Sequence, residues 1–110
     1  MAFKQRGVQG QAASTATAVL TAGDNVTIQP TKLILYGEEA DTNTDIFIVR
    51  SGNSADATTR FERIPSIGLN ERVDISFAGV ALYDGDAIYL ASTNASRINY
   101  DLSYNARTGE

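Results

Sequence analysis

A short acidic segment carries a residue spacing that could bind a metal ion. Asp41, Asn43 and Asp45 lie at alternate positions, which is the D-x-N-x-D spacing that opens a calcium-binding loop. The rest of such a loop is missing, because Ile46 stands where the loop needs glycine and Gly52 stands where it needs a bidentate glutamate. We therefore expect a polar loop whose side chains bond to nearby backbone groups.

Two further acidic pairs could supply carboxylates for acid–base chemistry. Asp84-Gly85-Asp86 places two of them on one short stretch, and Glu38-Glu39 forms a second pair. Neither pair has a third ligand close to it in the sequence, and two neighbouring carboxylates are not thereby aimed at one point. The first pair is more typical of a tight turn and the second of a charged loop.

The residue types that are missing exclude several kinds of chemistry. The chain of 110 residues contains no cysteine and no histidine. It therefore has no thiolate nucleophile, no zinc–sulfur site, no disulfide framework and no Ser-His-Asp or Cys-His arrangement. A carboxylate or tyrosine site would be the remaining route to catalysis, and no pair of residues is convincing. We expect no enzyme activity and no cofactor.

Composition and charge narrow the class of partner. Hydrophobic residues make up 43% of the chain, as in one ordinary globular domain, and the net charge is −4. The two lysines and seven arginines are scattered rather than clustered, which argues against nucleic-acid binding. No apolar run approaches the roughly 20 residues that span a bilayer, and no apolar segment follows the first six residues as a signal peptide requires. We expect no nucleic-acid partner and no membrane partner.

The clearest periodicity lies near the C-terminus. Ile98, Tyr100, Leu102 and Tyr104 alternate with small polar residues, a period of two that predicts a strand with one buried face. Together with residues 87–92 and a turn at 94–96, this segment predicts a β-hairpin.

Similar patterns predict strands throughout the chain, separated by turn signals. The predicted strands cover 15–22, 26–28, 31–36, 45–51, 60–64, 72–77, 87–92 and 98–104, and Pro30 is expected to limit the second to an edge or an end. This spacing favours an all-β fold, a two-sheet antiparallel β-sandwich of jelly-roll or immunoglobulin-like type. The expected core comprises Leu33, Leu35, Phe47, Val49, Val73, Ile75, Phe77, Leu82, Ile88, Leu90, Ile98, Tyr100 and Leu102.

Three parts of the chain are distinguished by composition. Residues 1–14 are small, polar and without a period, so we expect an extended N-terminal arm. Residues 15–104 form the sandwich domain, and residues 105–110 form a polar C-terminal tail. The arm is either a frayed terminus or a segment that orders against a neighbouring subunit. In the second case Phe3, Lys4, Arg6 and Val8 are its candidate contact residues.

From Asn25 onward the chain contains a series of distinctive segments: N-V-T-I-Q-P-T-K-L-I-L-Y, D-I-F-I-V-R-S-G, I-P-S-I-G-L-N-E-R-V-D-I, G-V-A-L-Y-D-G-D-A-I-Y-L-A-S and the final I-N-Y-D-L-S-Y. In these segments the chain resembles small virion structural proteins of tailed bacteriophages. The most distinctive is V-A-L-Y-D-G-D-A-I followed by the strand that ends in S-Y. These motifs are structural, and residues 1–14 lie outside them.

The resemblance implies a non-enzymatic virion protein, most simply a capsid decoration or cement protein that binds the head shell. A neck or tail adaptor is the alternative within this class. The implied partners are the major capsid protein or neck and tail proteins, and the chain is expected to form a homo-oligomer, with a trimer as one arrangement. A separate hypothesis is a carbohydrate or host-surface binding module that uses Tyr83, Tyr89 or the 41–45 loop, with or without calcium.

Overall fold

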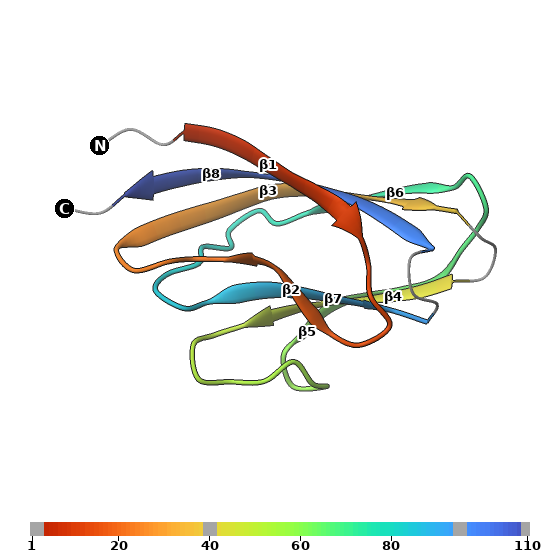
Figure 1. Cartoon of the computed structure of the whole chain (residues 1–110), viewed down its shortest axis with the longest axis horizontal. Coiled ribbons are helices and arrows are strands. Elements are labelled where there is room, and N and C mark those ends of the chain that lie inside the picture. Colours follow the sequence, from red (N-terminus) through yellow and green to blue (C-terminus); the bar gives the residue numbers. More distant parts are fainter. Residues whose placement is uncertain (1–3, 39–41, 94–96, 109–110) are drawn as a thin grey trace.

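The computed structural model describes residues 4–38, 42–93 and 97–108, which form eight strands and no helix (Figure 1). This part of the chain consequently has no helix that could cross a membrane. The strands are β1 (Lys4–Gln11), β2 (Thr17–Thr21), β3 (Val26–Gly37), β4 (Thr42–Val49), β5 (Arg60–Ile67), β6 (Arg72–Ser76), β7 (Ala87–Ser92) and β8 (Ile98–Thr108).

The eight strands form two four-stranded antiparallel sheets that pack face to face as two layers (Figure 1). The first sheet has the order β1-β8-β3-β6, and the second has the order β2-β7-β4-β5. Of the seven links between consecutive strands, only β4 to β5 joins neighbours in one sheet, and every other link passes from one sheet to the other. This is the jelly-roll arrangement, so the predicted all-β antiparallel sandwich is confirmed and the immunoglobulin-like alternative is not adopted.

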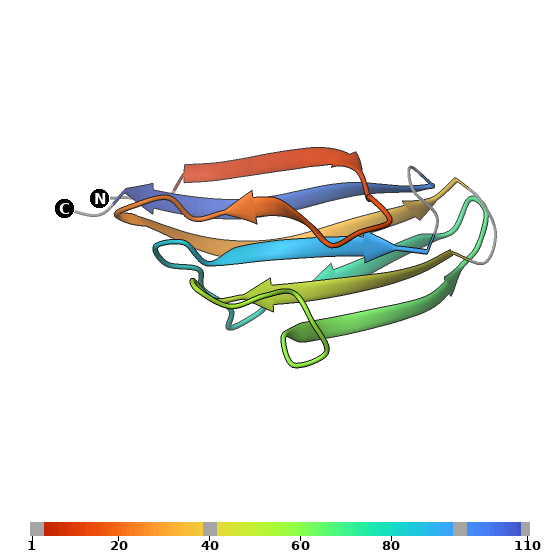
Figure 2. The ribbon, with the colours of Figure 1, turned by 60° about the horizontal axis from the view of Figure 1, so that its bottom comes forward.

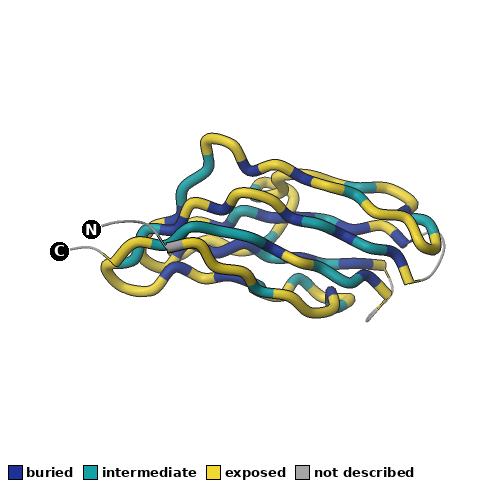
Figure 3. Tube along the Cα trace, turned by 90° about the horizontal axis from the view of Figure 1, so that it is seen from above, coloured by how far each residue is buried: buried dark blue, intermediate teal, exposed yellow. Residues whose placement is uncertain are grey.

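Buried and exposed residues alternate along the strands, and the buried ones meet between the sheets (Figure 3). Leu33, Leu35 and Leu102 of the first sheet and Ile88 and Leu90 of the second are fully buried in one cluster. Each such side chain contributes about 1.5 to 3 kcal/mol by leaving water. The sandwich is therefore held together by its two inner faces.

Most of the predicted core residues belong to this cluster, with informative exceptions. Val73 and Tyr100 are only partly buried against it. Phe47 and Val49 are buried but lie outside it, because Ile46 is the residue of β4 that joins the cluster. In a run of consecutive apolar residues, the sequence does not show which alternate set faces inward.

In the N-terminal segment, which was expected to be an extended arm, residues 4–11 are a strand of the sheet. Residues 4–11 pair with β8 without a break, from Lys4 opposite Ala106 to Gln11 opposite Asn99. The expected polar tail likewise continues β8 as far as Thr108, opposite Val26. Backbone pairing, which composition does not reveal, extends the sandwich beyond the predicted limits of 15 and 104.

The hairpin predicted over residues 87–104 is wrong. β7 pairs with β2 and β4 in the second sheet, whereas β8 pairs with β1 and β3 in the first. A chain reversal between two strands is needed both in a hairpin and in a link that changes sheets. Turn-forming residues therefore do not distinguish the two, and the hairpin of the described residues is β4–β5.

Pro30 lies inside a long strand instead of ending one. β3 continues through it because β6 pairs only with Lys32–Tyr36, leaving the first half of β3 without that neighbour. Ile28 exchanges two backbone hydrogen bonds with Leu82, of 2.9 and 2.8 Å, and Pro30 faces the same side two residues later. The missing N–H of proline is thus placed where no strand needs it, and the register shifts just after it.

Replacement of Gly37 by alanine should destabilise the fold. The backbone of Gly37 bonds to both Glu71 and Asn70, and an added methyl group would overlap the carbonyl oxygen of Gly68. We expect Gly37→Ala to lower the free energy of unfolding by about 2 to 3 kcal/mol in urea denaturation. Gly23→Ala is the control, since its methyl group would meet only Val26, at 3.9 Å. Equal effects of the two substitutions would contradict this account.

Candidate functional site

The predicted turn at Asp84-Gly85-Asp86 is a structural junction. Asp86 is buried, with 7% of the residue exposed, and its carboxylate accepts hydrogen bonds from the N–H groups of Ser51 and Tyr83, at 2.9 and 3.0 Å. Nη1 of Arg50 donates to the same carboxylate at 3.0 Å and to the carbonyl of Ala81 at 2.6 Å. The carboxylate therefore fixes the segment after β4 to the segment before β7.

The same turn also holds the connection between β2 and β3. Gly85 donates its N–H to the carbonyl of Ala22, and Ala22 donates to the carbonyl of Asp86. Gly85 has a φ of +84°, and a Cβ there would lie 2.7 Å from Oγ of Ser51. Only glycine satisfies both the backbone angle and this close approach.

The environment of Asp86 keeps its carboxyl group ionised. Burial by itself raises the pKa of this group, but the N–H groups of Tyr83 and Ser51 and the guanidinium of Arg50 outweigh burial and hold its pKa below the ordinary value. All of these donors belong to the protein scaffold. Asp86 therefore stabilises three loops and is not presented to a ligand.

The calcium-like spacing at Asp41–Asp45 does not form a metal site among the residues that can be described. Asp41 itself lies outside them. Oδ1 of Asn43 accepts the N–H of Ser66 at 2.7 Å, and the carboxylate of Asp45 accepts Nε and Nη2 of Arg63 at 2.7 and 3.0 Å. These bonds to Arg63 hold the pKa of Asp45 below its usual value.

No other acidic group takes the place of this site. In the described part of the chain, no three acidic side chains come close enough to hold a metal ion. Glu38, of the second acidic pair, accepts a hydrogen bond from Nδ2 of Asn99 at 2.7 Å, and Glu39 lies outside the described residues. Of the acidic residues that the sequence singled out, those that the structure describes therefore serve as partners for neighbouring donors.

The tyrosines do not form a common platform for a sugar or a base. Tyr83 is 57% exposed in the turn before β7, whereas Tyr89 is partly buried on β7. Tyr100 and Tyr104 pack against the core, and the hydroxyl of Tyr36 donates to Asn70 at 2.7 Å. Because these residues are distributed over both sheets and a loop, they do not offer adjacent stacking surfaces.

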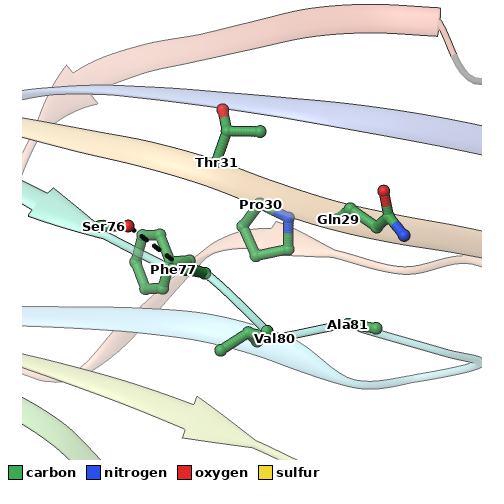
Figure 4. Close-up of a pocket in the computed structure, with 9 residues that line it drawn as sticks. Gln29, Pro30, Thr31, Ser76, Phe77, Val80 and Ala81 are labelled. Atoms are coloured by element: carbon green, nitrogen blue, oxygen red, sulfur yellow. Dashed lines mark hydrogen bonds between the residues drawn. The ribbon is translucent and has the colours of Figure 1, made fainter.

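The structure has a groove that sequence patterns did not indicate. It has a volume of about 480 Å³ and lies beside the half of β3 that does not pair with β6, where residues 77–81 bow away from the strand (Figure 4). Its lining is apolar at Pro30, Phe77 and Val80 and polar at Gln29, Thr31 and Ser76. None of its lining side chains ionises, so the groove offers packing and hydrogen bonds but no acid–base group. The sequence feature that could have indicated this groove is Pro30, a proline within a strand pattern.

The candidate contact residues of the N-terminal segment fall on β1, apart from Phe3, which lies outside the described residues. Lys4 and Arg6 occupy its first half, and Arg6 is exposed. Val8 is opposite Leu102 and packs partly against the core. Contact of these residues with another protein stays a prediction.

Asp86→Asn should destabilise the protein in a pH-dependent way. The amide removes the charge and places a donor against existing donors, so we expect a loss of about 2 kcal/mol of unfolding free energy at neutral pH. Because the folded pKa of Asp86 is lowered, its contribution is present above its unfolded pKa of about 3.9 and is lost as pH falls through the folded pKa. The difference from the unaltered protein should shrink below about pH 4 in thermal unfolding.

Asp84→Asn is the matched control, because the exposed Asp84 needs only one side-chain oxygen to accept the N–H of Asn25. An equal loss in both variants, or a loss from Asp86→Asn that does not change with pH, would contradict the role given to Asp86.

Comparison with known proteins shows likeness of fold. No protein family matches the chain, and no curated protein is similar to it. A solved structure of Bacillus endospore appendages, described as a novel family of disulfide-linked pili, has a TM-score of 0.58 at 14% identity, covering 99% of this chain and 88% of that one.

Two viral structures are more distant. The coat protein of Tobacco streak virus has a TM-score of 0.46 at 14% identity, covering 94% of this chain and 85% of that one. Infectious bursal disease virus, Gx strain, has a TM-score of 0.37 at 7% identity, covering 93% of this chain and 32% of that one. At 14% identity the likeness to the endospore appendage is one of fold alone and shows nothing about function.

Proposed function

We propose that the chain is a non-enzymatic structural protein of a tailed-phage particle, a decoration or cement protein that binds the head shell. The observation that carries the proposal is that acidic side chains of the chain are paired with its own basic side chains. The carboxylates of Asp45, Asp74 and Asp86 are each paired with basic side chains, and Asp86 is also bound to backbone N–H groups. They stabilise a rigid sandwich and leave no reactive group in the groove beside Pro30.

The sequence resemblance from Asn25 onward supports the same class. The V-A-L-Y-D-G-D-A-I segment contains the glycine and the aspartate that form the junction between three loops, which is what a structural motif should do. Many copies of such a unit on one shell would bind durably, since multivalency turns weak contacts into stable attachment.

The N-terminal strand is the proposed contact region. Phe3, Lys4, Arg6 and Val8 would supply its contacts to the major capsid protein or to a neighbouring copy. β1 lies at an edge of the first sheet, and Arg6 is exposed there. A positive residue at the contact is notable in a chain whose net charge is −4.

A fibre subunit is the second candidate, favoured by the likeness of fold to the endospore appendage. That appendage is described as disulfide-linked, and this chain has no cysteine, so any fibre would have to assemble without disulfide links.

Particle fractionation tests the proposal. A tagged copy of the protein should sediment with heads when particles are separated on a density gradient, and labelled particles should carry it over the whole head in electron micrographs. Label at a single vertex would indicate the neck or tail adaptor instead. Absence from particles, together with filaments of the purified protein, would replace the proposal with the fibre.

Arg6→Glu should weaken head binding by roughly tenfold or more if a charged contact is reversed. The double variant Asn53→Glu/Ala57→Glu, in the exposed loop between β4 and β5, is the matched charge control, because it changes the net charge by the same amount as Arg6→Glu. It should bind as the unaltered protein does. Equal loss in the two variants would argue that net charge, and not the β1 contact, controls binding.

A further inference from the structure

Four strands lie at the edges of the two sheets, and three of them have features that discourage pairing with another chain. β2 has five residues and a register shift between Ala18 and Leu20. β6 also has five residues and carries the charged pair Arg72 and Asp74. β5 pairs irregularly with β4 and contains Pro65.

β1 is the exception among these edges. It has eight residues, pairs with β8 in one continuous register and contains no proline. Its charges are confined to Lys4 and Arg6, so the segment from Gly7 to Gln11 is uncharged. It runs along one side of the molecule with no strand beyond it (Figure 2). A regular, uncharged edge is a template for a further strand.

The hydrogen-bond pattern identifies which backbone groups are open. The N–H of Ala12 donates to the carbonyl of Ile98 at 2.9 Å. Because the direction of the backbone groups alternates along an antiparallel strand, the even-numbered residues of β1 direct their N–H and C=O groups to β8. The odd-numbered residues of β1 therefore direct their N–H and C=O groups to the open edge: Gln5, Gly7, Gln9 and Gln11.

We propose that this edge pairs antiparallel with the β1 edge of a second copy of the chain, with Val8 on the two-fold axis. A second copy is the matching occupant because the other three edges are protected, so only β1 against β1 joins two open ones. One register pairs all four open residues, with Gln5 opposite Gln11 and Gly7 opposite Gln9. The result is a continuous eight-stranded sheet across a two-fold dimer.

Charge and shape favour the antiparallel direction. A parallel pair would place the Lys4 and Arg6 of both copies side by side, which is unfavourable. In the antiparallel register Arg6 lies opposite Gly10 of the second copy, which has no side chain of its own. The ring of Tyr100 lies beside Gly10, with its hydroxyl 3.0 Å from the position of a Cβ, and offers the guanidinium an aromatic surface.

A proline at position 7 tests the edge directly. Gly7 faces outward, and a Cβ there would meet only the carbonyl of Leu102 at 3.7 Å, so Gly7→Pro removes an outward N–H without removing a bond to β8. Gly7→Ala is the control that keeps the N–H. In sedimentation equilibrium, the unaltered protein and Gly7→Ala should dimerise, and Gly7→Pro should raise the dissociation constant at least tenfold. A protein that stays monomeric at about 1 mM overturns the proposal.

Disulfide trapping tests the register and does not depend on a proline variant that folds. The chain has no cysteine, so Val8→Cys introduces a single thiol. On the two-fold axis the two Cα atoms would lie about 4.5 Å apart, within the range that a disulfide spans. Val8→Cys should form a covalent dimer under mild oxidation. The exposed Gln11→Cys should not, because in this register position 11 lies opposite Gln5 and far from position 11 of the second copy. Equal yields, or none from Val8→Cys, contradict the register.

The pairing concerns purified protein and does not depend on the particle to which it belongs. A dimer that does not bind heads would disprove the proposed function alone, and a monomer that binds heads would disprove the pairing alone.

Discussion

The fold depends on burial of one apolar face from each sheet against the other. Leu33, Leu35 and Leu102 meet Ile88 and Leu90 in a single cluster, and no other layer covers these residues. Since every link except β4 to β5 changes sheets, neither sheet can form without the other. The loops at the ends must therefore hold two layers in register, and that requirement accounts for the polar network at Asp86.

The use of charged residues follows from this architecture. Arg50 and Asp86 are 36 positions apart, yet they connect two loops at one end of the sandwich. Arg63 and Asp45 connect the hairpin strands β5 and β4. The carboxylates and guanidinium groups of these two pairs would be available to a ligand or substrate only if their partners were absent. In the described residues, the acidic motifs stabilise the scaffold, which agrees with the structural role that we propose.

The sequence predicted strands wherever one face is apolar and the other polar. Arg72–Phe77 and Ile98–Tyr104 fall on β6 and β8, because a period of two reports burial of one face directly. No local pattern of residues shows which strands pair with each other. The place of β1 in the sheet and the separation of β7 from β8 were therefore not predicted. The bond between Asp86 and Arg50 was equally invisible, since it arises from distance in the fold, whereas the turn at Asp84–Asp86 was predicted from glycine and aspartate alone.

The pairing of β1 with β8 has a consequence for the way the chain folds. Lys4 lies opposite Ala106, so β1 gains its partner only when β8, about 100 residues later in the chain, has been made. Of the consecutive strands, only β4 and β5 pair with each other and can do so early. Folds dominated by such distant pairings form in milliseconds to seconds, slower than helical domains of similar size. The jelly roll is thus completed only once β8 has been made, and β1 is the strand whose pairing partner is made latest after it.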